Sequence, residues 1–143
     1  MEVAWVKANL KKRATKKLLL KQQFYTWIVG IGNMIKVWID DIREVPEGYT
    51  WCRSTNNALR FITQNKDYIE LIDIDHDAGD YQKDGGDFIS VLKELERLSR
   101  NPRWAPIYKD LIKTWKFRLH SANPVGVQNM RAILQANGWK EVF

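Results

Sequence analysis

The sequence has one cysteine and two histidines among its 143 residues. The lone cysteine, Cys52, cannot form an internal disulfide, and these residues together are too few for a structural zinc site. Nothing in the sequence therefore depends on an oxidising compartment or on zinc. We expect a cytoplasmic protein.

Long apolar runs and glycine-rich phosphate loops are also missing. No uncharged segment reaches the roughly 20 apolar residues that a membrane-spanning helix needs, so we expect no membrane span. Glycine loops of the Walker or dinucleotide-binding type do not occur. What the chain does have is 45% hydrophobic residues and seven tryptophans, enough for one hydrophobic core. We therefore expect a single folded domain.

Basic residues are concentrated at the start of the chain. The net charge is +6, and residues 1–33 hold seven basic residues against one acidic residue. Residues 34–143 hold 16 of each sign, so this predicted domain is neutral. One interpretation of residues 1–33 is a non-native upstream extension, with Met34 as the start. The other is a basic amphipathic helix that binds RNA or a membrane surface.

Short apolar runs alternate with amphipathic segments from residue 35 onward. The patterns predict strands at 35–39, 50–54, 68–74, 114–120 and 139–143, and helices at 54–65, 87–100, 107–113 and 125–138. The alternation of strands and helices favours an α/β fold with a three-layer, mostly parallel sheet.

Polar residues follow three of these strands at their carboxyl ends. They are Asp40-Asp41, Asp75-His76-Asp77 and His120-Ser121, and they include both histidines of the chain. Because the carboxyl ends of parallel strands lie on one rim of a sheet, these side chains should share a pocket. That shared rim is the strongest functional signal that the residues give by themselves.

The chemistry of such a rim follows from its charges. Carboxylates held close together repel each other unless a cation or a proton lies between them. Oxygen ligands suit Mg²⁺ or Mn²⁺ better than zinc. A histidine with an ordinary pKa of about 6.5 can act as acid or base near neutral pH. A phosphoester is therefore a plausible ligand.

Several of these residues also have a purely structural interpretation. Asp80, Asp84 and Asp87 are best explained as solvated loop charges. Ser121 and Asn123 can form local backbone hydrogen bonds, because Asn123-Pro124 has the pattern that begins a helix. The functional hypothesis therefore depends on the combination of residues.

Four motifs, taken in order, resemble one known family. They are VWIDDIR at residues 37–43 followed by Pro46 and Gly48, IDIDHDAG at 72–79, Gly85-Gly86-Asp87, and HSANPVG at 120–126. From about Lys36 to Trp139 the chain resembles the cyclic-phosphate processing receiver family, a divergent branch of the receiver-like α/β domains.

The resemblance implies a flavodoxin-like or receiver-like fold with an acidic pocket that acts on, or senses, cyclic phosphate ends of RNA or nucleotides. It implies catalytic roles for Asp75, His76 and His120, phosphate binding by Arg43, Ser121 and Asn123, and metal binding by Asp40, Asp41, Asp75 and Asp77. The lysine that receivers carry before a proline is not matched here, so a phosphorelay role is not implied.

Three functional hypotheses follow. The first is a metal-dependent phosphoesterase that processes a cyclic nucleotide or an RNA 2′,3′-cyclic end, with Mg²⁺ or Mn²⁺ as cofactor. The second is a sensor that binds such a ligand without turnover, because groups that stabilise a charged transition state also bind a charged ligand. The third is a receiver-like interaction module.

Overall fold

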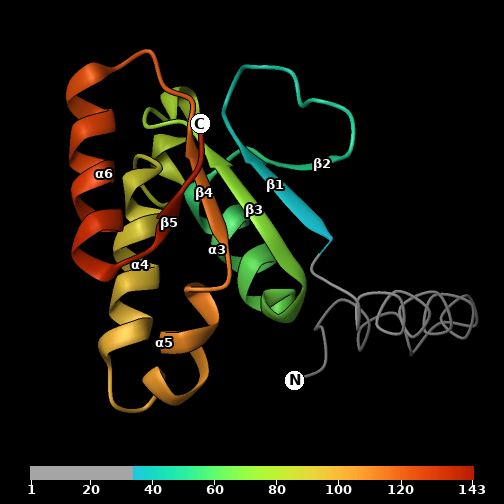
Figure 1. Cartoon of the computed structure of the whole chain (residues 1–143). Helices are drawn as coiled ribbons and strands as arrows, with labels where there is room; N and C mark the ends of the chain where they lie inside the picture. The colour runs from blue at the N-terminus through green and yellow to red at the C-terminus, as the bar shows by residue number, and fades with distance from the viewer. Residues whose placement is uncertain (1–33) are drawn as a thin grey trace, which may run out of the picture.

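A computed structural model describes residues 34–143 (Figure 1). Its strands are β1 (Ile35–Ile39), β2 (Tyr49–Cys52), β3 (Ile69–Ile74), β4 (Lys116–Leu119) and β5 (Lys140–Glu141). Its α-helices are α3 (Thr55–Gln64), α4 (Ile89–Arg100), α5 (Ala105–Ile112) and α6 (Pro124–Asn137), with 3₁₀ turns η1 (Lys66–Tyr68) and η2 (Gly79–Lys83). The expectations for residues 1–33 concern a segment outside the described residues.

The strands form one sheet in the order β2-β1-β3-β4-β5, and every neighbouring pair is parallel. A parallel sheet of this order with crossover helices is flavodoxin-like, as expected for a receiver-like domain. The predicted fold class is therefore confirmed. The reversal of strand order at β1 also creates a switch point between β1 and β3.

One side of the sheet faces the hydrophobic core. Along β1, Val37 and Ile39 are fully buried in it, and along β3 Ile72 and Ile74 are as well. Because successive strand residues point to opposite faces, the residues between them lie on the other side. The sheet is thus apolar on one face and carries different side chains on the other.

All four α-helices contribute to this single core. Ala58 of α3, Leu92 of α4, Ile112 of α5 and Met130 of α6 all belong to it. The physical reason is the connectivity. The crossovers from β2 to β3, from β3 to β4 and from β4 to β5 all run in the same direction, and right-handed crossovers then place their helices on the same face. Residues 34–143 therefore form two layers, the sheet and one layer of helices, where the sequence predicted three.

Among residues 34–143 no helix covers the opposite face, and the reason is the connection from β1 to β2. This crossover runs in the other direction, but residues 40–48 are a loop without a helix. Asp40, Asp41 and the residues after them thus form an irregular rim directly above the switch point. This rim is where the polar residues of the sequence converge.

The helix ends agree with the sequence signals. Ser54 accepts a hydrogen bond from the Asn57 N–H as the N-cap of α3, and Asn123 accepts one from the Gly126 N–H as the N-cap of α6. Gly138, in the left-handed conformation, ends α6. No helix of the described residues is long and apolar enough to cross a membrane.

Candidate functional site

Three carboxylates meet at the switch point. Asp40 and Asp41 follow β1, and Asp75 follows β3, its neighbour in the sheet. Each offers an oxygen that lies within 4.8 Å of the oxygens of the others, and all three residues are buried. The sequence prediction of a shared acidic rim is realised for these three residues.

The three charges raise each other's energy. Burial raises the pKa of Asp41 above its usual value, and the negative charges of Asp40 and Asp75 raise it further. A hard divalent cation would relieve this repulsion, because oxygen donors in a buried cluster are the ligands that Mg²⁺ and Mn²⁺ prefer. The residues present therefore fit such an ion.

Asp40 is also held by its own loop. Its Oδ1 accepts hydrogen bonds from the backbone N–H groups of Ile42, at 3.0 Å, and Arg43, at 2.9 Å. Burial by itself would raise the pKa of Asp40, but these two donors, with His120, outweigh it and hold the pKa below its usual value. The pKa of Asp40 is thus lowered, whereas that of its neighbour Asp41 is raised.

His120 bridges two buried carboxylates. Its Nδ1 lies 2.6 Å from Oδ1 of Asp73, and its Nε2 lies 2.9 Å from Oδ2 of Asp40. The ring also stacks on Trp38, with centroids 3.8 Å apart and an interplanar angle of 3°. Carboxylates only accept hydrogen bonds, so each ring nitrogen of His120 faces an acceptor. This geometry makes His120 a residue that positions Asp40.

Sequence reasoning did not single out Asp73, which is fully buried. Its Oδ2 has no hydrogen-bond partner within residues 34–143, although it lies 3.8 Å from Nη1 of Arg118. The available signal was an aspartate in the interior of the apolar strand β3. A buried charge at such a position requires a partner, and His120 is that partner.

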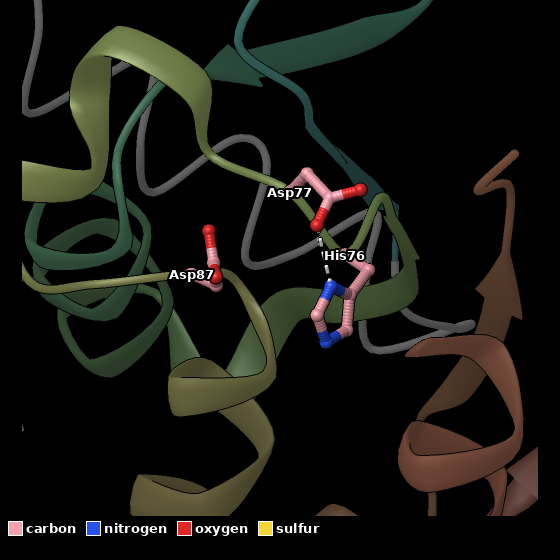
Figure 2. Close-up of side chains that lie close together, drawn as sticks. All are labelled: His76, Asp77 and Asp87. Carbon is pink, nitrogen blue, oxygen red and sulfur yellow. Dashed lines mark hydrogen bonds and ion pairs between the residues drawn. The ribbon is translucent and has the colours of Figure 1, made fainter. Parts of the chain in front are cut away.

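A second cluster lies beside the first and contains His76, Asp77 and Asp87 (Figure 2). Nδ1 of His76 lies 2.8 Å from Oδ1 of the exposed Asp77. Asp87 accepts a hydrogen bond from the Ala78 N–H at 3.0 Å and one from the Gln82 amide at 3.3 Å. Asp77, expected as a fourth metal ligand, thus lies in this second cluster.

His76 is held on several sides. Its backbone N–H donates to Oδ1 of Asp75 at 2.7 Å, and its ring lies against Gly126 in the first turn of α6. A Cβ at Gly126 would come within 2.5 Å of the ring, which explains why the HSANPVG motif needs glycine there. Among residues 34–143, no group hydrogen-bonds to Nε2 of His76.

The three residues expected to bind phosphate surround the rim. Arg43, about half exposed, donates from Nη1 to the backbone oxygen of His120 at 2.6 Å and lies 3.6 Å from Oδ2 of Asp40. Oγ of Ser121 accepts from the Asn123 N–H at 3.1 Å, and the Asn123 amide faces Asp77 at 3.4 Å. Asn123 begins α6 and Ser121 forms a local turn, so the structural interpretation of both holds. The Asn123 side-chain amide donates toward Asp77 of the second cluster.

Comparison with known proteins identifies the family. A family model described as the cyclic-phosphate processing Receiver domain matches residues 35–136, more than two thirds of the chain. No match is found among curated proteins or among solved structures. The matched range contains both acidic clusters and the HSANPVG motif. The chain therefore belongs to the cyclic-phosphate processing Receiver domain family.

Proposed function

We propose that the rim hydrolyses a cyclic phosphodiester with the help of Mg²⁺ or Mn²⁺. The observation that carries the proposal is the convergence of Asp40, Asp41 and Asp75, three buried carboxylates at the switch point. Family membership supports cyclic phosphate as the substrate class. Asp40, Asp41 and Asp75 would hold the ion, which when bound supplies positive charge for the phosphoryl oxygens.

The proton transfer is assigned to His76 in this proposal. Asp77 accepts from Nδ1 and so leaves Nε2 as the reactive nitrogen, the arrangement in which a carboxylate orients a catalytic imidazole. Water attacks phosphorus and releases one proton to solvent, the bond from phosphorus to one ribose oxygen breaks, and protonated His76 gives its proton to that oxygen and regains one from solvent. His120 keeps Asp40 in place, since both of its ring nitrogens are already engaged.

The substrate phosphate would be held by groups on the rim. The Arg43 guanidinium is exposed and can pair with a phosphoryl oxygen, while the Ser121 hydroxyl can donate to another. Asn123 would orient both the substrate and Asp77 through its amide. Each of these contacts would be charge-assisted, because the phosphate carries negative charge.

A sensor without turnover is the second candidate. The engagement of both nitrogens of His120 favours it, because this removes one of the two histidines from proton transfer. The same residues would then bind the cyclic phosphate and its ion without breaking the ring. A test of the proposal must therefore separate binding from chemistry.

Phosphorus NMR of uridine 2′,3′-cyclic phosphate with the full chain provides that separation. We expect a new monoester resonance in Mg²⁺ or Mn²⁺, which is lost in EDTA. Asp75→Asn should slow its appearance at least about 100-fold, because several kcal/mol of charge stabilisation are removed. Asp87→Asn is the matched control and should leave the rate nearly unchanged, because the Asp87 carboxylate bonds to the Ala78 N–H and the Gln82 amide and is assigned no part in holding the ion, the phosphate or the proton.

The other outcomes decide between the candidates. Broadening or a shift of the cyclic resonance without conversion would support the sensor and end the hydrolase proposal. Turnover that persists in EDTA or in Asp75→Asn would exclude the ion site described above. His76→Gln should abolish turnover while leaving binding of the cyclic phosphate in place. A His76→Gln variant with normal turnover would remove His76 from the mechanism.

A further inference from the structure

The face of the sheet that no helix of residues 34–143 covers is basic and aromatic. The strand register aligns one row of side chains across all five strands: Tyr49, Lys36, Leu71, Lys116 and Lys140. The next row toward the rim contains Trp51, Trp38, Asp73 and Arg118. Since residues 34–143 are neutral as a whole, four cations in these two rows make the charge distribution strongly one-sided.

These side chains are available to a ligand. Lys116, Lys140 and Arg118 are exposed, and Lys36 is half-buried. The acidic residue of the two rows, Asp73, is fully buried and bonded to His120, so it does not offset the surface charge.

Aromatic rings lie at the β2 edge of the same face. Tyr49 and Trp51 are both partly exposed, and each lies under a cation: Lys36 over the Tyr49 ring at 5.8 Å and Arg53 over the Trp51 ring at 4.6 Å. Tyr49 also forms a T-shaped pair with Trp38, with ring centroids 5.8 Å apart. The rings on β2 and the lysines on β1, β4 and β5 provide stacking surfaces and phosphate contacts together.

The two rows continue directly into the candidate site. The same strand positions two residues further on are occupied by Asp40, Arg53, Asp75 and His120. From Lys36 to Asp40 the distance along the strand is about 13 Å, four residues at roughly 3.3 Å each. The row of lysines runs across the strands, parallel to the rim, so a strand that lies along it reaches the buried carboxylates when its end turns along the strand direction.

We propose that this face binds single-stranded RNA and guides its 3′ end into the rim. Phosphates would contact Lys36, Lys116 and Lys140, and bases would stack on Tyr49 and Trp51, the combination by which proteins bind single strands. Delivery of a cyclic-phosphate end rests on the proposed function, whereas the binding of RNA to this face does not. A free cyclic nucleotide would use the rim alone.

Fluorescence anisotropy with a labelled 12-nucleotide RNA carrying a 3′-hydroxyl tests the binding. The full chain is compared with K36Q/K116Q/K140Q and with the control K93Q/K109Q/K113Q, whose exposed lysines lie on the helical side. Both triple variants have the same net charge and keep residues 1–33. We expect the sheet-face variant to bind about tenfold or more weakly, and its salt dependence to fall by about two units of slope. The control should change by less than about twofold.

The aromatic contribution is tested with Tyr49→Leu, which keeps the apolar volume and removes the phenol ring. Affinity should fall about fivefold or more if a base stacks there. Equal losses for the two triple variants, or no RNA binding at all, would overturn the proposal. A Tyr49→Leu variant with unchanged RNA affinity would overturn the stacking role of Tyr49.

Turnover of two substrates separates this inference from the proposed function. The sheet-face variant should raise KM for an RNA with a 2′,3′-cyclic end and leave KM for uridine 2′,3′-cyclic phosphate unchanged. If uridine 2′,3′-cyclic phosphate is turned over and K36Q/K116Q/K140Q changes neither the affinity nor the KM for RNA, the sheet-face inference alone is overturned. Loss of RNA binding in the sheet-face variant, with neither substrate turned over, would overturn the proposed function alone.

Discussion

The two acidic clusters of the rim have similar residue types and opposite environments. Asp40, Asp41 and Asp75 are buried and face one another, whereas Asp77 is exposed and bonded to His76. In the second cluster Asp77 is paired with the imidazole of His76. In the first, Asp75 accepts from the His76 backbone N–H, and the carboxyl of Asp41 faces the charges of both Asp40 and Asp75. The difference indicates that burial and mutual repulsion, more than the number of carboxylates, mark a cation site.

The buried cluster also depends on a neutralising neighbour that the second cluster does not need. His120 lies between Asp40 and Asp73 and contacts both, and its side chain is only 12% exposed. The His76 side chain is about as buried, at 15% exposed, but it pairs with a single carboxylate, Asp77, which is 57% exposed. The two histidines of the chain should therefore respond very differently to removal.

The largest effect is expected from His120→Ala. This change leaves Asp40 and Asp73 as buried carboxylates without their partner, which typically costs about 3–5 kcal/mol in the free energy of unfolding. His76→Ala, beside an exposed carboxylate, should cost about 1 kcal/mol or less. Urea unfolding at neutral pH measures both. Equal losses for the two variants would contradict the buried bridge.

The next effect concerns binding of the ion. Mn²⁺ at 100 times its dissociation constant should stabilise the folded chain by about 2.7 kcal/mol. Differential scanning fluorimetry should show the corresponding rise in Tm for the wild type and for Asp87→Asn, and none for Asp75→Asn. A rise lost in Asp87→Asn and kept in Asp75→Asn would move the ion to the second cluster.

The sequence predicted the location of the site better than its internal contacts. Asp40, Asp41 and Asp75 were brought together by one rule, that parallel strands end on the same rim. Asp73 was missed because the pattern of β3 was interpreted as apolar, and its role depends on His120, 47 residues away. Long-range pairs of this kind depend on strand register, which a single sequence does not specify.

The fold was predictable for a similar reason. Apolar runs and helix caps such as Ser54 and Asn123 lie within the local sequence, so element positions could be inferred. The number of layers depends on which crossovers carry a helix. The loop at residues 40–48 replaces one such helix, and the exposed face of the sheet follows from that loop. Tyr49 and Lys36 became candidate ligand contacts only when this face was known.

The smallest expected effect separates the two neighbours Asp40 and Asp41. The pKa of Asp41 is raised in the folded state by burial and by Asp40 and Asp75, so its ionised form destabilises the metal-free fold above that pKa. Asp41→Asn should therefore raise Tm by a few degrees at pH 7 without metal, and this gain should vanish as pH falls toward 4.

The pKa of Asp40 is lowered, so its contribution has the opposite sign. Asp40 stabilises the fold above the ordinary aspartate pKa of 3.8, and this stability is lost as pH falls through its lower folded value. Asp40→Asn should accordingly lower Tm at pH 7. Scanning fluorimetry of both variants between pH 3 and pH 7 in EDTA checks the signs. With added Mn²⁺ the wild type should have a higher Tm than Asp41→Asn, because only the wild type then gains the ion that compensates its three carboxylates. If Asp41→Asn is less stable than the wild type even in EDTA, the three carboxylates do not repel one another as the geometry implies.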